Sequence, residues 1–280
     1  MSKPPQNNLS RRSRWLKLVT FAVVVAYVLV CVLMALFQRQ LLYHPYVMTP
    51  AQTDAAAQER HMERWYNAAG QPIGMKRLCL QRPAQAQALL TYGNGSHATG
   101  NPGYFDNLQN LGRFDIYILN YPGYEDRPGT PTQANLFHAA DDAMASLSTN
   151  LPLYLIGQSL GTGVAAYLAG TYPDRVKGVV LQAPFNHMSA VAQYHYPWLP
   201  VSLLLLDRFA SDDYLSHYHG PVGIMLGEVD QVVPPQFGRR LYDGYAGPKQ
   251  VWVFPGANHG DVFYKIPDIA PDLKKLWGFP

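Results

Sequence analysis

Cysteine is scarce in this chain: two of the 280 residues are cysteines. Cys31 lies inside a long apolar run and Cys79 in the more polar remainder, so the pair is not expected to form a disulfide. A small disulfide-stabilised fold is therefore excluded. His217 and His219 stand two residues apart, but no cysteine or acidic cluster completes a metal site around them. The sequence suggests neither a metal nor an organic cofactor.

Acidic residues are absent from the first fifty positions, which hold six lysines and arginines. The rest of the chain carries sixteen basic and nineteen acidic side chains, and it is slightly acidic. The net charge of +3 therefore belongs to the N-terminus rather than to a basic face of the folded part. We expect no nucleic-acid partner.

Charge is also absent from residues 18–37, among which Thr20 is the one clearly polar member. A helix of this length rises about 30 Å, the thickness of the hydrocarbon core of a bilayer. Basic residues before the run and a single Arg39 after it predict a signal-anchor over residues 15–38, with the lipid bilayer as its partner. Residues 1–14 are then cytoplasmic and the rest lies outside the cytoplasm, in the periplasm if the cell is bacterial. A cleavable signal peptide is the alternative, although no Ala-x-Ala site follows the run.

Internal repeats and linker-like segments are missing from residues 45–280, which we interpret as one domain. Short apolar runs alternate there with helical patterns, which predicts an α/β fold with a doubly wound, mainly parallel sheet. Residues 185–218 interrupt the alternation with aromatic residues and prolines, and we expect a lid there. Apart from the turn described next, the predicted strands are 75–81, 87–91, 115–120, 176–181, 222–226 and 250–254, and the predicted helices are 51–69, 102–111, 131–147 (with Thr130 as N-cap), 236–245 and 269–277.

The sequence GQSLG at residues 157–161 follows a short apolar run and opens a stretch rich in alanine and glycine. Gly-x-Ser-x-Gly between a strand and a helix is typical of a nucleophile elbow, in which the serine stands at the tip of a sharp bend. The strained backbone of the bend explains why residues almost without side chains flank the serine. We therefore expect Ser159 to be a nucleophile. A plain turn in a βα unit is the alternative.

A reactive serine needs a base, and the base needs an orienting acid. In a doubly wound sheet both must follow the carboxyl ends of strands, because the site crevice lies there. His259 follows the strand 250–254, and Asp230 follows the strand 222–226. The order Ser159, Asp230, His259 is the one expected for this arrangement. The alternative acids are Glu228, Asp212 and Asp213.

An oxyanion hole needs two backbone N–H donors in addition to these side chains. The amide of Leu160, directly after the nucleophile, is the first candidate. The second is the amide of Asn94 in the loop YGNG at residues 92–95, which follows the strand 87–91. A simple tight turn is the alternative interpretation of that loop.

Five segments of the chain resemble the α/β-hydrolase family. More narrowly, they are similar to the single-span, membrane-anchored α/β-hydrolase-domain proteins, a group that includes protein depalmitoylases. The resemblance implies a Ser159–Asp230–His259 triad and an oxyanion hole from Asn94 and Leu160. The segments are GNG at 93–95, NYPGY at 120–124, GQSLG at 157–161, GEVDQVVP at 227–234 and NHGD at 258–261.

Motifs and resemblance together predict a membrane-anchored serine hydrolase that cleaves an ester or thioester through an acyl-enzyme. Two positions depart from the group: Tyr92 stands where it usually has histidine, and Pro122 where it usually has arginine or a small residue. A serine peptidase of the same fold is one alternative, because the same triad serves amides. A catalytically idle, membrane-tethered binding protein is another.

The substrate pocket is predicted from aromatic residues near these loops. We expect Tyr92, Tyr194 and Trp198 to line it. Residues 203–206 are all leucine. They either belong to an apolar acyl pocket or bilayer-facing surface of the lid, or form a turn of a core helix.

Overall fold

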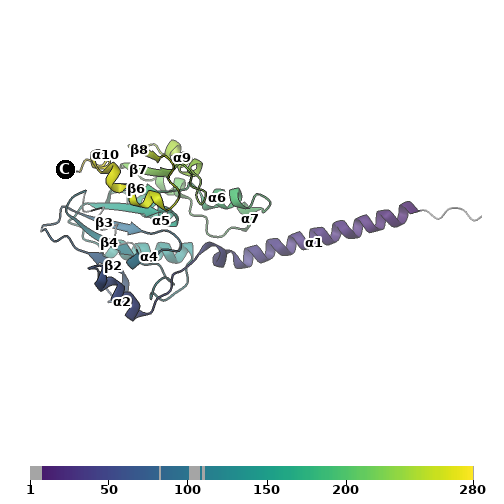
Figure 1. Ribbon diagram of the computed structural model, residues 1–280, viewed down its shortest axis with the longest axis horizontal. Coiled ribbons are helices and arrows are strands. Elements are labelled where there is room, and N and C mark those ends of the chain that lie inside the picture. Colours follow the sequence, from purple (N-terminus) through teal and green to yellow (C-terminus); the bar gives the residue numbers. More distant parts are fainter. Residues whose placement is uncertain (1–7, 82, 101–107, 109–110, 280) are drawn as a thin grey trace, which may run out of the picture.

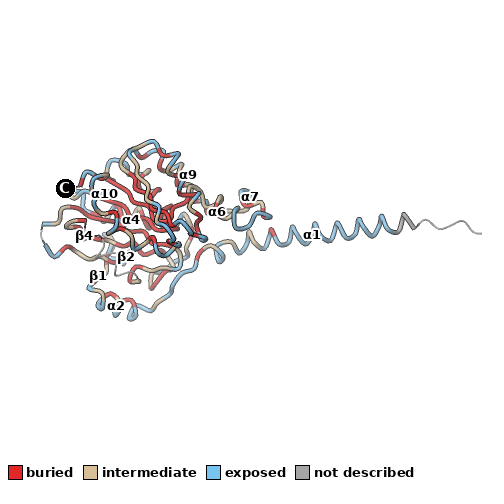
Figure 2. Tube along the Cα trace, turned by 45° about the horizontal axis from the view of Figure 1, so that its top comes forward, coloured by how far each residue is buried: buried red, intermediate tan, exposed pale blue. Residues whose placement is uncertain are grey.

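The computed structural model describes residues 8–81, 83–100, 108 and 111–279. Helix α1 (Asn8–Leu42) extends away from the rest of the molecule, as Figure 1 shows. Its stretch Arg12–Leu42 is long and apolar enough to cross a membrane, judged by length and composition. Residues along most of this stretch are exposed (Figure 2), so the helix offers an apolar surface to its surroundings. The expected apolar helix over residues 18–37 is part of α1.

In the described part of the chain, eight strands form one sheet in the order β1-β2-β4-β3-β5-β6-β7-β8. The β1–β2 and β2–β4 pairs are antiparallel, and all the others are parallel. The mainly parallel α/β sheet is therefore confirmed, and the carboxyl ends of β3, β5, β6, β7 and β8 share one edge. The strands are β1 (Glu63–Tyr66), β2 (Pro72–Arg77), β3 (Ala86–Thr91), β4 (Phe114–Leu119), β5 (Leu153–Gln158), β6 (Val176–Gln182), β7 (Val222–Gly227) and β8 (Lys249–Phe254).

Helices cover both faces of this sheet, as two residues of β5 show. The ring of Tyr154 packs on Trp277 with ring centroids 4.5 Å apart. A Cβ at Gly157 would lie 2.9 Å from the Cβ of Ala165. Because side chains three positions apart on a strand point to opposite faces, the helices that carry Trp277 and Ala165 lie on opposite sides. The long helices of the body are α4 (Gln133–Ser146), α5 (Leu160–Thr171), α9 (Pro235–Gly244) and α10 (Ile266–Trp277).

The expected helix over residues 51–69 is only half present. Helix α2 (Pro50–Glu59) begins with a capping box, in which the hydroxyl of Thr49 accepts from the amide of Gln52 and the Gln52 side chain accepts in return. The chain then turns and forms β1, because the ring of Trp65 is buried against that of Tyr117 with centroids 4.8 Å apart. Tertiary burial of an aromatic side chain overrides the helical preference of an alanine-rich segment.

Two further expectations concern helix boundaries. Helix α4 begins after Thr132, whose hydroxyl accepts from the amide of Asn135, so Thr130 is not its N-cap. The helix predicted over residues 102–111 lies almost entirely outside the described residues. The remaining short elements are two 3-10 turns, η1 (Ala98–Gly100) and η2 (Asp261–Tyr264).

The segment predicted as a lid contains three short helices, α6 (Met188–His195), α7 (Val201–Leu204) and α8 (Ser211–Leu215). Helix α8 belongs to the body, because a Cβ at Gly170 of α5 would collide with the backbone of Tyr214. Residues 188–206, called the lid segment below, lie instead beside the C-terminal part of α1 (Figure 1). Within it Leu203 is 82% exposed, so this run of leucines is not a turn of a core helix.

Candidate active site

Ser159 stands at the tip of the turn between β5 and α5. Its φ of +47° lies in a region that costs a non-glycine residue about 1–3 kcal/mol, so the surrounding structure must hold it there. A Cβ at Gly157 would lie 2.7 Å from the Cα of Thr162, and one at Gly161 would collide with the carbonyl oxygen of Thr91. Both glycines are therefore required by the close approach of β3, β5 and α5.

Asp230 and His259, which follow β7 and β8, reach the serine at the shared edge of the sheet. The Nε2 atom of His259 lies 3.0 Å from the Oγ atom of Ser159. Its Nδ1 atom lies 2.7 Å from the Oδ2 atom of Asp230. Ser159 is 9% exposed and Asp230 is buried, whereas the imidazole retains some contact with solvent. A hydroxyl, an imidazole and a carboxylate in this sequence of hydrogen bonds can transfer the serine proton to the imidazole.

Backbone amides orient the buried carboxylate of Asp230. Its Oδ1 atom accepts hydrogen bonds from the N–H groups of Val232 and Val233, both at 2.9 Å. The other oxygen is thereby left facing His259. A carboxylate held in this way can fix the imidazole in one tautomer.

The alternative acids contact other groups. Glu228 accepts from the amide of Gly256 at 2.9 Å, and Asp212 lies 2.8 Å from the Nε2 atom of His187. Together with Asp213, this second pair is the one group of three potential metal ligands found in the described ranges. None of its members hydrogen-bonds to His259 or Ser159, so the group does not contribute to the arrangement around the serine.

The side chain of Asn94 fixes the loop after β3. Its Oδ1 atom accepts from the amide of His44 at 2.8 Å and from the hydroxyl of Tyr124 at 2.9 Å. Its Nδ2 atom donates to the carbonyl oxygen of Leu42. The loop is therefore tied directly to the segment that leaves α1.

The same loop approaches the serine closely. A Cβ at Gly93 would lie 3.2 Å from the Cβ of Ser159, so the backbone of the loop borders the nucleophile. Among the described residues, the backbone N–H groups of Asn94 and Leu160 have no hydrogen-bond acceptor. Two unpaired donors beside a serine are what a developing oxyanion requires.

Tyr92, predicted to line the substrate pocket, is instead completely buried. Its hydroxyl donates to the Oδ1 atom of Asn120 at 2.7 Å and accepts from the amide of Tyr121 at 3.1 Å. Burial raises the pKa of both Tyr92 and Tyr121 well above the ordinary value, so these phenols stay neutral donors. The side chain of Tyr92 therefore packs in the core under the loop and does not line a surface pocket.

The two other predicted pocket residues lie in different places. Tyr194 lines an open pocket together with Asp230 and packs edge-on against Phe237, with ring centroids 5.8 Å apart. Trp198 lies beside α1, where its carbonyl oxygen accepts from the hydroxyl of Tyr27 at 2.9 Å. The structure therefore places Tyr194, but not Trp198, next to the acid.

Sequence reasoning missed Gln182, which lies at the carboxyl end of β6. Its side-chain amide lies 3.4 Å and 3.3 Å from the carbonyl oxygens of Val262 and Phe263, in the turn directly after His259. Its Oε1 atom accepts from Gln158 at 3.2 Å. This glutamine therefore ties the turn that carries the imidazole to the sheet. The sequence did contain a signal for this role: the adjacent apolar strands β5 and β6 each end in a glutamine, Gln158 and Gln182.

Comparison with known proteins agrees with this fold. Residues 89–218 match the family model described as alpha/beta hydrolase fold. An uncharacterised protein of Mycobacterium tuberculosis is 35% identical over 159 residues, which cover 55% of this chain and 56% of that protein. The lysophosphatidylserine lipase ABHD12 of Danio rerio is 34% identical over 166 residues, which cover 51% of this chain and 42% of the lipase.

The matched parts of the chain span about half the length of these curated relatives. Among solved structures, the monoacylglycerol lipase of Paleococcus ferrophilus superposes with a TM-score of 0.56 at 19% identity, covering 78% of this chain and 99% of the lipase. That likeness shows a shared fold. Taken with the elbow and the mainly parallel sheet, these matches show that the chain has the α/β-hydrolase fold.

Proposed function

We propose that this protein is a membrane-anchored serine hydrolase that cleaves a carboxylic ester or thioester through an acyl-enzyme intermediate. The observation that carries the proposal is the series of hydrogen bonds from Ser159 through His259 to Asp230, at 3.0 Å and 2.7 Å. Two proteins that the chain is similar to are named as lipases, which favours an ester over an amide.

In the proposed reaction, the Nε2 atom of His259 takes the proton of Ser159 while its Oγ atom attacks the substrate carbonyl carbon. The oxyanion that forms accepts hydrogen bonds from the amides of Leu160 and Asn94. Asp230 accepts a hydrogen bond from the Nδ1–H group of His259 and stabilises the imidazolium. The imidazolium then donates its proton to the departing alcohol or thiol, which leaves an acyl group on Ser159. A water molecule, deprotonated by the same imidazole, releases the acid and restores the serine.

The anchor belongs to the same proposal. Residues 15–38 of α1 cross the bilayer, residues 1–14 stay in the cytoplasm, and the catalytic domain over residues 45–280 lies outside it. The basic residues that precede the apolar run support this orientation. A reporter that fluoresces only in the cytoplasm, fused after the last residue, should be dark. A bright reporter would contradict the orientation and leave the chemistry untouched.

Labelling with a fluorophosphonate, which reacts with activated serines, tests the central claim. The wild type and the control variant Ser216→Ala, altered at an exposed serine, should be labelled. Ser159→Ala should not be labelled, because its nucleophile is missing. Labelling that persists in Ser159→Ala, or its absence from the wild type, would favour the idle binding protein.

The leaving group is tested separately. The full chain in detergent is offered a p-nitrophenyl ester, an acyl thioester and a peptide amide with comparable acyl groups. Turnover of the ester or the thioester, lost in Ser159→Ala, supports the proposal. Turnover of the amide alone would assign the site to a peptidase.

A further inference from the structure

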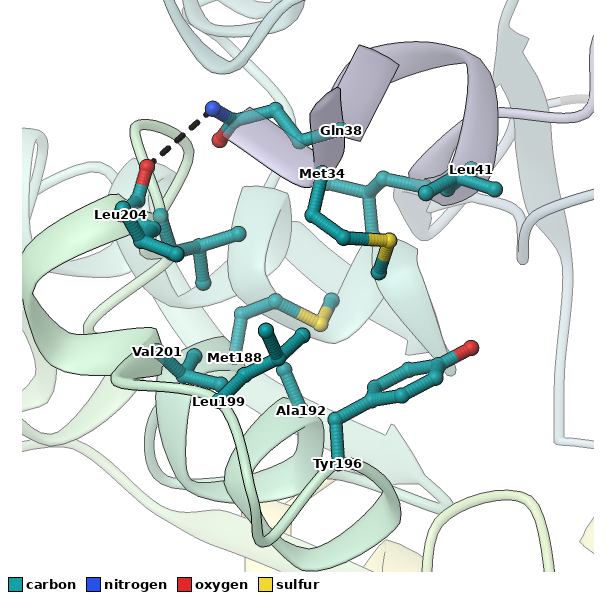
Figure 3. Close-up of a pocket in the computed structure, with 11 residues that line it drawn as sticks. Met34, Gln38, Leu41, Met188, Ala192, Tyr196, Leu199, Val201 and Leu204 are labelled. Atoms are coloured by element: carbon teal, nitrogen blue, oxygen red, sulfur yellow. Dashed lines mark hydrogen bonds between the residues drawn. The ribbon is translucent and has the colours of Figure 1, made fainter. Parts of the chain in front are cut away.

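A pocket of about 120 Å³ opens between α1 and the lid segment (Figure 3). One water molecule needs roughly 10–15 Å³ on the same scale, so the pocket has room for a string of methylene groups. Met34 and Leu41 of α1 line it on one side, and Met188, Leu199 and Leu204 of the lid segment on the other. One wall of the pocket is therefore the helix that the membrane surrounds.

The polar side chain in this wall has its own partners. The amide nitrogen of Gln38 donates to the carbonyl oxygens of Leu204 at 3.1 Å and Ala35 at 2.7 Å, and its oxygen accepts from the amide of Leu206 at 2.7 Å. The first of these bonds is dashed in Figure 3. Gln38 therefore ties the lid segment to α1. A guest in the pocket would meet mainly hydrocarbon, which suits an alkyl chain and penalises a polar ligand.

Charges mark the level of this pocket relative to the bilayer. No charged residue occurs between residues 196 and 206. The first charge after the apolar run of α1 is Arg39, and the first after the uncharged part of the lid segment is Asp207. These two groups meet at 3.2 Å. The ion pair between Arg39 and Asp207 therefore marks the end of both uncharged stretches.

Contacts beyond that level reach into the middle of the apolar run. The hydroxyl of Tyr27 donates to the carbonyl oxygen of Trp198, and Cys31 packs with Leu199 and Val201. Tyr27 and Cys31 both lie within residues 18–37. If that run crosses the bilayer, the tip of the lid segment lies in the same leaflet as the second half of α1.

The outer surface of the lid segment fits that position. Leu203 is 82% exposed, Leu206 64% and Trp198 52%. Large apolar side chains exposed along one uncharged segment are unfavourable in water and favourable in lipid. The lid segment and α1 together therefore present lipid-facing side chains outside and an apolar pocket inside.

The inner end of the pocket adjoins the catalytic loop. Leu42 lines the pocket, and its carbonyl oxygen accepts the side-chain hydrogen bond of Asn94. Asn94 belongs to the loop that borders Ser159. The inner end of the pocket is therefore one hydrogen bond away from the loop that borders Ser159.

We propose that the substrate is a membrane lipid with a long fatty-acyl chain, and that this chain occupies the pocket between α1 and the lid segment after entering sideways from the bilayer. This inference rests on the proposed hydrolase function. It makes α1 a wall of the substrate site in addition to an anchor, so residues of the membrane helix should set the preferred chain length.

Two tryptophan variants of α1 test the inference in the full-length protein in detergent. Met34→Trp fills the pocket, while Leu33→Trp places the same ring one position away, on an exposed part of the helix. The probes are the p-nitrophenyl esters of butanoic and palmitic acid. Met34→Trp should lower the ratio of kcat/KM for palmitate over butanoate at least about tenfold, because space for several methylenes is lost. Leu33→Trp should leave the ratio within about twofold.

A ratio unchanged in Met34→Trp, with butanoate turned over and Ser159 labelled by fluorophosphonate, would overturn the pocket and leave the proposed function standing. Absence of both turnover and labelling in the wild type would overturn the proposed function and this inference with it. If Met34→Trp does not fold, Met34→Ala replaces it, and its larger pocket should shift the optimum toward longer chains.

A measurement on the wild type addresses the depth of the lid segment. The protein is placed in phosphatidylcholine vesicles whose acyl chains carry bromine, a contact quencher of tryptophan. Trp198 should contribute a quenched component that is missing from Trp198→Phe. Equal quenching of the two proteins would place the lid segment outside the bilayer and contradict sideways entry.

Discussion

The carboxyl edge of the sheet and the surface between α1 and the lid segment are held together differently. At the sheet edge, directed hydrogen bonds hold Ser159, His259 and Asp230, and Asp230 alone has three partners. Between α1 and the lid segment, apolar contacts dominate, with polar links at Tyr27 and Gln38 and an ion pair from Arg39 to Asp207 just after the segment. Apolar contacts tolerate exchange of similar side chains, whereas a hydrogen-bonded triad does not. Changes at the edge should therefore act on rate, and changes at α1 on selectivity and stability.

Removing the charge of Asp230 should have the largest effect. Asp230→Asn keeps the shape of the side chain but presents an amide to His259, which favours the wrong tautomer. A fall in kcat of about 10⁴-fold is expected. Glu228→Gln removes the same charge two residues away, at an exposed position, and should remain within about twofold. Equal effects in the two variants would mean that net charge, not orientation of the imidazole, matters.

Asn94 tests whether the loop after β3 is positioned by its side chain. Asn94→Ala removes the acceptor for His44 and Tyr124, so the loop amide should move away from the oxyanion. We expect kcat to fall by about 10²-fold while KM changes little. Asn94→Asp keeps the acceptor oxygens and should recover part of the rate. A purely structural role would instead appear as lower thermal stability with an unchanged kcat.

Asp207 probes the junction between α1 and the body. Its Oδ2 atom accepts from the hydroxyl of Tyr43 at 3.0 Å and pairs with Arg39. Asp207→Ala leaves the buried Tyr43 hydroxyl without an acceptor, which should lower the free energy of unfolding by about 1–3 kcal/mol. Thermal unfolding in detergent measures this, with Asp243→Ala at an exposed position as control. Equal free energies of unfolding for the two variants would show that the contacts of Asp207 do not stabilise the protein.

The smallest effects on stability and KM are expected at exposed leucines. A comparison of such leucines distinguishes the lid segment from the rest of the surface. Leu203 and Leu80 are 82% and 93% exposed, so Leu203→Ser and Leu80→Ser should each change stability in detergent by less than about 0.5 kcal/mol. In vesicles, Leu203→Ser alone should raise the KM for the palmitate ester, by about two- to fivefold. An equal rise in KM for Leu80→Ser would show that the effect does not depend on the lid segment.

Much of the fold could be predicted from the sequence, because most of the parallel strands are short apolar runs that are buried on both faces. Strand β1 could not be predicted in this way, because it depends on the packing of Trp65 against Tyr117 of β4, about fifty residues further along the chain. Local alanine content favoured a helix, and no local signal reports a distant aromatic partner.

The candidate site follows a similar rule. Ser159, Asp230 and His259 could be picked out because each directly follows a predicted strand, and parallel strands end at one edge. The side of the backbone from which a residue points is harder to predict. Tyr92 is the first residue of the loop at 92–95, but its side chain faces the core, where its hydroxyl donates a hydrogen bond to Asn120.

The contact between the lid segment and α1 could not be predicted at all. An apolar run that faces lipid and one that faces protein have the same composition, so leucines at 203–206 were compatible with either. The structure separates them by exposure: Leu204 lines the pocket while Leu203 is turned outward.

The link from Asn94 to Leu42 and His44 has a practical consequence for work with a soluble form. Cutting the chain just after α1 would remove the carbonyl oxygen that receives the Asn94 side chain. Cutting one turn earlier would retain it and would also keep Arg39 beside Asp207. An anchor-free version intended for kinetics should therefore begin before Arg39, and its apolar stub will require detergent.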